Sequence, residues 1–409
     1  MSLRHVRAST IDAPSPAPNR LGRGALFLMT FLYALSMTMI GPLMPHIIAA
    51  FSVRLSVAGL LVTVQQFGGA LAIIAAALFA DRAHKPLLIA VAFAAFSASL
   101  AVASVAPWYV MLTGAFFFLG ASSRLFDSVG NADVARWNPA RSATLLSLLH
   151  TVFAVGALTG PIAVTALLES GFSWRIPVAL LAATAGAAVA AYIWFNRPLR
   201  PSTRGAVADS VEVAGRTVGA LAVLRAPRTW VACATMLAYV GHQAGFTVWL
   251  PMFLQTSLGA SAALAAAALS LYWLGIIVGR LIAAAIAGRV TIKAQLIAGG
   301  LTGAVMLLFA FISRDPRLFA AAAFGAGVAG GAVIPNLVTL VCAWFPANTA
   351  TASSVLFLMA TFGHMVFPLT VAAVSEAAGF SVGFLIPVVA LGAVAIPALF
   401  LPGATRPAA

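Results

Sequence analysis

The chain has 409 residues, of which 62% are hydrophobic and 8% charged, and its formal net charge is +14. A soluble domain of this size could not bury so much apolar surface, so the composition excludes an ordinary soluble protein. In a soluble protein this charge would suggest nucleic-acid binding, but here the basic residues lie between apolar blocks, where they report membrane topology. We therefore expect a lipid bilayer, and no nucleic acid, as a partner.

The first 23 residues are polar, basic and proline-containing, and they lack the apolar core of a cleavable signal peptide. We expect them to form a cytoplasmic tail. Twelve apolar blocks follow, long enough to cross a ~30 Å hydrocarbon core as helices. We predict all-α membrane-spanning helices at 24–45, 55–79, 87–106, 108–132, 143–168, 174–196, 229–256, 262–287, 294–313, 318–344, 350–375 and 380–401.

The second half of the chain repeats features of the first. Glu169 corresponds roughly to Glu376, and the lysines Lys85 and Lys293 follow the second and eighth predicted helices, 208 positions apart. Tyr33 and Pro45 map onto Tyr239 and Pro251, 206 positions later. We therefore predict two pseudo-symmetric six-helix bundles. The predicted segments are a tail at 1–23, bundles at 24–196 and 229–401, a cytoplasmic linker at 197–228 and a tail at 402–409.

The basic residues predict the orientation. With the N-terminus inside, 17 of the 23 Lys and Arg residues fall in cytoplasmic segments, four fall outside and two lie in helices. Cytoplasmic loops carry an excess of Lys and Arg, so we expect both termini in the cytoplasm and the chain in the inner (plasma) membrane.

Other chemistry is not indicated. Cys233 and Cys342 lie in predicted helices and suggest neither a disulfide nor a metal framework. There is no Walker loop and no convincing nucleophile or metal-ligand cluster. We expect no ATP-driven cycle, no cofactor, no metal and no enzyme activity, and we expect the chain to act as a monomer.

The stretch GALAIIAAALFADRAHKPLLI, residues 69–89, resembles the signature loop between helices 2 and 3 of the major facilitator superfamily, Gly-x-x-x-Asp-Arg-x-Gly-Arg-Arg/Lys. Asp81, Arg82 and Lys85 match, whereas Ala77 and the pair 83–84 depart from it. The resemblance implies parallel six-helix halves with a small-molecule site between them near the midplane. It also implies that Asp81 pairs with cationic groups and latches one conformation.

We assign further basic residues near these helix ends to gating. The gating candidates are Asp81, Arg82, Lys85, Arg136, Arg280 and Arg289.

Other stretches are similar to the fucose permease-like branch of that superfamily, which includes sugar–proton and sugar–sodium symporters. They are DSVGN (127–131), LLHTVFAVGALTGP (148–161), YVGHQAGFTVWLPMFL (239–254) and LYWLGIIVGRL (271–281). The branch commonly has Glu where this chain has Gln243, which disfavours sodium coupling because sodium prefers several hard oxygen ligands.

Asp127 is the only one of nine acidic residues predicted to lie well inside a membrane segment. An unpaired charge there costs at least ~2.5 kcal/mol, which makes the residue a functional candidate. Gly120, Arg124, Asp127 and Asn131 share one helix face. A carboxyl group balanced between burial and a nearby cation can take up and release a proton. The alternative is an intrahelical Arg124–Asp127 pair that serves packing and insertion.

The remaining polar and aromatic residues of the predicted helices are candidates for substrate binding, because amides, imidazoles and flat rings suit a neutral polyhydroxylated ligand. The candidates are Asn131, His150, Tyr239, His242, Gln243, Trp249, Gln65, Gln66, Asn336 and His364. For each the alternative is an interhelical hydrogen bond. For Trp249 an anchor at the membrane interface is a further alternative.

The sequence therefore predicts a secondary transporter that works by alternating access. The favoured function is proton-coupled uptake of a sugar or similar small polar solute, with Asp127 as the proton carrier. The alternatives are drug–proton antiport, organic anion transport with Arg124 unpaired, and a non-transporting sensor or scaffold.

Overall fold

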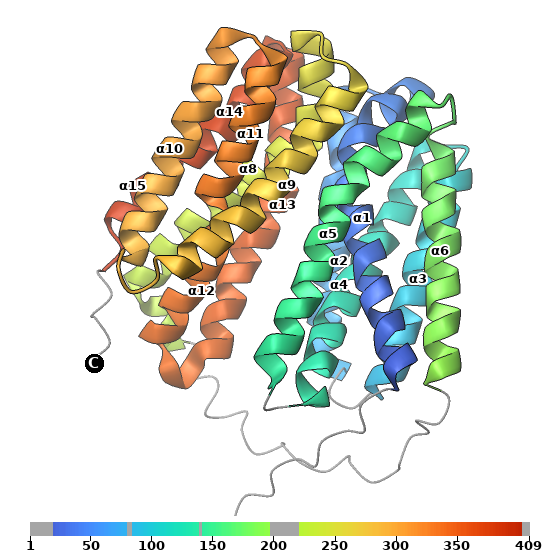
Figure 1. Cartoon of the computed structure of the whole chain (residues 1–409), viewed down its shortest axis with the longest axis horizontal. Helices are drawn as coiled ribbons and strands as arrows, with labels where there is room; N and C mark the ends of the chain where they lie inside the picture. Colours follow the sequence, from blue (N-terminus) through green and yellow to red (C-terminus); the bar gives the residue numbers. More distant parts are fainter. Residues whose placement is uncertain (1–18, 80–83, 139–140, 197–220, 403–409) are drawn as a thin grey trace, which may run out of the picture.

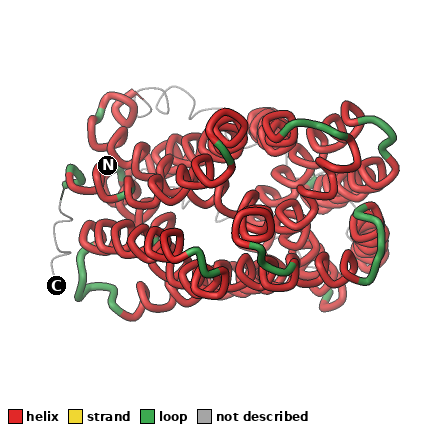
Figure 2. The backbone as a smooth tube through the Cα atoms, turned by 90° about the horizontal axis from the view of Figure 1, so that it is seen from above, coloured by secondary structure: helices red, strands yellow, loops and turns green. Residues whose placement is uncertain are grey.

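The computed structural model describes residues 19–79, 84–138, 141–196 and 221–402, and within them the regular structure is helical (Figures 1 and 2). The first half contains α1 (Arg20–Phe51), α2 (Leu55–Phe79), α3 (Lys85–Val105), α4 (Tyr109–Trp137), α5 (Ser142–Glu169) and α6 (Arg175–Phe195). The second half contains α8 (Pro227–Leu258), α9 (Ala262–Ala285), α10 (Ile292–Ser313), α11 (Pro316–Gly330), α12 (Val333–Trp344), the 3-10 turn η2 (Pro346–Asn348), α13 (Thr349–Ala378), α14 (Phe380–Ala393) and α15 (Ala395–Leu399).

Eleven spans in the described residues are long and apolar enough to cross a membrane, with α11–α12 and α14–α15 each counted as one. The remaining predicted helix, α8, is as long as α1 at 32 residues. It is less apolar because it carries polar side chains such as His242 and Gln243, which are buried inside the protein. The chain is an all-helical, multi-span membrane protein, as the sequence predicts.

The helices gather in two groups, α1–α6 on one side and α8–α15 on the other (Figure 1). The groups meet mainly where α1 packs on α8, α2 on α13 and α5 on α9. We call the end at which α1 begins and α6 finishes the terminal end, and the opposite end the far end. In Figure 1 the groups converge at the far end, which is uppermost in the view, and diverge towards the terminal end.

The two halves repeat each other at one constant offset. The first residues of α1, α2, α4 and α5 (Arg20, Leu55, Tyr109 and Ser142) each lie 207 positions before the first residues of α8, α9, α11 and α13 (Pro227, Ala262, Pro316 and Thr349). Ser52 and Gly259, which end α1 and α8 in the left-handed conformation, are also 207 apart. The Tyr33–Tyr239 and Lys85–Lys293 pairings from the sequence are therefore each one residue out of register, whereas Glu169 and Glu376 are true counterparts.

Close backbone contacts between helices also repeat. A side chain on Gly120 of α4 would collide with the carbonyl oxygen of Gln65 on α2. In the second half, Gly327 of α11 faces the carbonyl oxygen of Tyr272 on α9 in the same way. Small residues let membrane helices approach closely, so these glycines fix the α2–α4 and α9–α11 packing.

Several predicted boundaries shift. α1 begins at Arg20 because the side-chain oxygen of Asn19 caps it by accepting a 2.7 Å hydrogen bond from the Gly22 amide, so part of the predicted tail is helical. Residues 221–225 are helical within the predicted linker, and α8 begins at Pro227. The predicted helices 318–344 and 380–401 are each interrupted, at residues 331–332 and at Val394. Glycine accounts for the first interruption, because Gly330 and Gly331 are poor helix formers.

Candidate functional site

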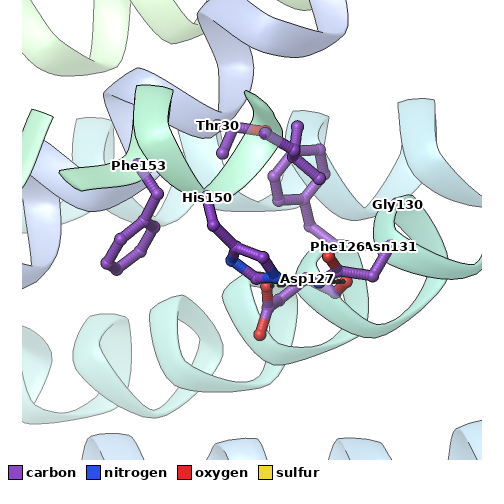
Figure 3. Close-up of a pocket in the computed structure, with 8 residues that line it drawn as sticks. Thr30, Phe126, Asp127, Gly130, Asn131, His150 and Phe153 are labelled. Atoms are coloured by element: carbon purple, nitrogen blue, oxygen red, sulfur yellow. Dashed lines mark hydrogen bonds between the residues drawn. The ribbon is translucent and has the colours of Figure 1, made fainter. Parts of the chain in front are cut away.

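The predicted proton carrier lies in a small pocket between α4 and α5. Asp127 and Asn131 of α4, His150 of α5 and Thr30 of α1 line it (Figure 3). The Asn131 side-chain amide donates to the Asp127 carboxylate at 2.9 Å and to the Asp127 backbone oxygen at 2.7 Å. The imidazole of His150 points towards Asp127 and is close enough for their charges to interact. The structure thus brings together three of the residues that the sequence singled out.

Arg124 has a different partner from the one that the alternative interpretation requires. Its Nη2 donates to the Gln66 side-chain oxygen on α2 at 3.2 Å. Gly69 makes room for it, because a Cβ there would lie 2.6 Å from Arg124 Cγ. Among the described residues, Arg124 and Asp127 form no ion pair with each other or with any other side chain. The intrahelical pair is therefore not formed in this conformation.

Arg124 also lies close to the second bundle. His364 of α13 is near enough to Arg124 for their charges to interact, and its Nδ1 is 3.1 Å from the Ala360 carbonyl oxygen. One residue further along α13, the Met365 carbonyl accepts a 2.6 Å hydrogen bond from Thr63 Oγ1 of α2. The guanidinium group therefore lies near the surface where the two bundles meet.

Three candidates of the second half are buried inside their own bundle, and two of them bond to another helix. His242 is fully buried, and its Nδ1 lies 2.8 Å from the Pro387 carbonyl oxygen of α14. Its ring is 6.4 Å from the ring of Tyr239, which is also buried. Trp249 is buried, and its Nε1 donates to the Pro368 carbonyl of α13 at 2.9 Å. These contacts match the structural alternatives, and the burial of Trp249 argues against an interfacial anchor.

Two further amide candidates are buried without such contacts. Gln65 of α2 is 5% exposed and Gln243 of α8 is 7% exposed. Neither side-chain amide forms a hydrogen bond within the part of the chain that the structure describes. They sit on the helices that line the bundle interface, α2 and α8.

Asn336 and the gating candidates Arg280 and Arg289 lie towards the terminal end. Asn336 of α12 donates to the Gln295 side-chain oxygen on α10 at 3.0 Å, a partner that the sequence analysis missed. Arg280 Nε donates at 3.3 Å to the carbonyl of Gly331, at the break between α11 and α12. Arg289 is exposed in the turn that follows α9, and it donates a hydrogen bond to the carbonyl of Ala285, the last residue of that helix. Asp81 and Arg82 lie outside the described residues.

The sequence analysis placed only Asp127 well inside a membrane segment, and the structure adds a second buried carboxylate, near a helix end. Asp133 lies near the end of α4 but is only 4% exposed, and it accepts a 2.9 Å hydrogen bond from Trp137 Nε1. Lys85 and Arg136 are close enough to interact with its charge. The i, i+4 spacing of Asp133 and Trp137 is the sequence signal that could have revealed this pair.

Two bundles of membrane-spanning helices related by an internal repeat are the architecture of secondary transporters. The family model described as Major Facilitator Superfamily matches residues 26–313 and, in a second match, residues 231–409. The chain therefore belongs to the major facilitator superfamily, a family of transporters rather than enzymes. No curated protein matches the chain.

Solved structures share the fold at low identity. A bacterial homologue of the human lysosomal transporter Spinster, in an inward-facing and unoccupied conformation, superposes with a TM-score of 0.77 at 18% identity, covering 93% of this chain and 95% of that one. The nucleoside transporter NupG gives 0.73 at 15% identity, with 93% and 97% covered. A single-substitution variant of the fucose–proton symporter FucP of E. coli gives 0.62 at 18% identity, with 94% and 99% covered.

Proposed function

We propose that the protein is a proton-coupled transporter of a sugar or a similar small polar solute, with Asp127 as the proton carrier. The observation that carries this proposal is the contact set of Asp127. Its carboxyl group is held by a neutral amide, Asn131, faces the imidazole of His150, and is not fixed in an ion pair with any described residue. A carboxyl group without a permanent counter-charge can be protonated in one step of a cycle and deprotonated in another.

Polar side chains on the helices of the bundle interface suit a polyhydroxylated ligand. The amides of Gln65 and Gln243 supply donors and acceptors from both bundles, and His150 is exposed to the same space as Asp127. The structurally similar FucP is described as a fucose–proton symporter, a protein that couples a sugar to protons. We extend the proposal to the fucose permease-like branch, to a monomer, and to an inner-membrane location with both termini in the cytoplasm.

The test is Asp127→Asn in proteoliposomes. We expect proton-driven accumulation to be lost while counterflow exchange of the solute persists, because exchange does not require proton release. Asp315→Asn is the matched control, since Asp315 is an exposed acid that only caps its own helix α11. Full accumulation by Asp127→Asn under an imposed pH gradient would refute the carrier role.

One observation favours a second candidate, organic anion transport. Arg124 has a neutral partner, Gln66, and no carboxylate partner within the described residues. A guanidinium group binds a carboxylate in a bidentate manner, so a solute with a carboxylate could supply the missing charge. If this candidate is right, Arg124→Gln abolishes uptake of sugar acids and leaves any uptake of neutral sugars intact.

A further inference from the structure

At the far end, two glutamate side chains each form a hydrogen bond with the backbone of the opposite bundle. Glu376, near the end of α13, accepts a 2.9 Å hydrogen bond at Oε1 from the backbone amide of Ser56, in the first turn of α2. Glu169, the last residue of α5, accepts a 3.0 Å hydrogen bond at Oε1 from the backbone amide of Ala263, in the first turn of α9. Each carboxylate therefore caps a helix that belongs to the opposite bundle.

The two contacts are equivalent under the internal repeat. Ser56 and Ala263 are 207 positions apart, and so are Glu169 and Glu376. This is the offset that relates the helices of the two halves. A carboxylate of the first half thus caps a helix of the second half, and the equivalent carboxylate of the second half caps a helix of the first. A packing accident would have no reason to obey the repeat twice.

The first amide groups of a helix have no partner within the helix and carry a partial positive charge, so a carboxylate there gains both a hydrogen bond and an electrostatic attraction. In α9 the capping is shared, because Ser261 Oγ of the same bundle accepts from the Leu264 amide while Glu169 takes the Ala263 amide. Of the two caps on α9, the one from Glu169 is therefore the cap that forms only when the two bundles are in contact at this end.

The surroundings of the two glutamates place them at the closed end of the bundle interface. Ala372 of α13, one helical turn before Glu376, is fully buried, and its Cβ would lie 3.3 Å from a Cβ on Gly59 of α2. Glu169 lines a cavity of about 130 Å³ together with His46 and Gln255. The charged neighbour of Glu376 is Arg54, which is close enough for their charges to interact.

We propose that Glu169 and Glu376 form a pair of pseudo-symmetric locks that hold the far end of the transporter closed, and that both locks break when the far end opens. A contact made in one state alone shifts the equilibrium by its own free energy, so each lock favours the far-end-closed state. The proposal concerns the conformational cycle and does not depend on which solute or ion is transported.

The test measures far-end opening through the alkylation rate of a buried cysteine, in a background where Cys233 and Cys342 are replaced by Ser. The reporters are Ala372→Cys, beside the Glu376 lock, and Thr165→Cys, which is buried beside the Glu169 lock. Each lock is removed and read at both reporters: Glu169→Gln and Glu376→Gln are each combined with Ala372→Cys and, separately, with Thr165→Cys. A rate increase at the distant reporter indicates opening of the whole far end rather than local fraying.

We expect each Glu→Gln change to raise the alkylation rate at the opposite reporter about 2- to 5-fold, the range given by the usual strength of a charge at a helix N-terminus. The double variant should raise it about 4- to 25-fold, because distant contacts add in free energy. The matched control is Ser261→Ala, which removes a cap from the same end of α9 without crossing between bundles, and it should leave the rate unchanged.

The proposal is overturned if both single variants and the double variant react at the wild-type rate, or if Ser261→Ala raises the rate as much as Glu169→Gln does. It is also overturned if each variant affects its own neighbouring reporter alone, since that result would mean local loosening. Thermal stability measured in parallel identifies a general loss of fold, which would raise the rate for the control as well.

Discussion

The two halves of the molecule share a backbone arrangement but differ in the chemistry that they carry. At the offset of 207, Arg124, Asp127, Asn131 and His150 of the first half correspond to Gly331, Ile334, Val338 and Phe357 of the second. The glycines that bring α2 against α4 and α9 against α11 are retained in both halves. The charged and titratable cluster is therefore confined to one half of a repeated scaffold.

The polar groups of the second half serve a different purpose. His242, Trp249 and Asn336 each bond to another helix of the same bundle. Polar contacts of this kind hold membrane helices together. The repeat therefore constrains the sites of close backbone approach and leaves the other positions free to differ. One half carries the carboxyl, imidazole and guanidinium groups, while polar contacts hold the helices of the other half together.

The largest effect is expected at the shared scaffold. Gly120→Ala and Gly327→Ala should each lower the free energy of unfolding by at least about 3 kcal/mol, because the new Cβ would collide with a backbone oxygen that cannot move without separating two helices. Thermal unfolding in detergent measures this.

The matched control is Gly114→Ala, also on α4, where a Cβ would meet nothing within 4 Å. Similar losses at Gly120 and Gly327 would support a common scaffold. A loss at one position alone would break the comparison between the halves.

A second prediction concerns Gln243, the amide of α8 that we assign to the ligand. Gln243→Ala should weaken binding of a polar solute about 5- to 150-fold, because a buried hydrogen-bond partner left unmade costs roughly 1–3 kcal/mol. Equilibrium binding to the purified protein measures it. Gln255→Ala on the same helix is the control, because that side chain bonds to the Pro251 carbonyl at the far end. Unaltered affinity for polar solutes, with tight binding of a lipophilic cation, would favour drug antiport.

The smallest expected effect distinguishes the role of His242 from that of His150. His242→Phe should cost about 1–2 kcal/mol of stability, because the buried Pro387 carbonyl loses its partner, and should leave proton coupling intact. His150→Phe, which installs the residue found at its counterpart Phe357, should change coupling and leave stability near the wild-type value, since His150 is exposed. If both variants alter stability alone, His150 is a structural residue like His242 and the contrast between the halves is weaker.

Much of the fold could be predicted from the sequence because its signals are local. Apolar blocks of membrane length predict helices wherever they occur, and the basic residues between them predict topology. The breaks at residues 331–332 and Val394 were not foreseen, since apolar composition continues through both. The register of the repeat was estimated within one residue, and the first residues of the repeated helices were needed to fix it at 207.

For the candidate site, the sequence by itself determined that Asp127 is an acid inside a membrane helix, and that Arg124 and Asn131 share its face. A periodicity of 3.6 residues is enough to establish that. The tertiary structure alone determines which neighbour each side chain contacts. Arg124 turns to Gln66 and Asp127 to Asn131, while Glu169 and Glu376 reach into opposite bundles. Apart from the Asp127–Asn131 bond, these contacts join helices distant in the chain, and their geometry arises only when the helices and bundles pack.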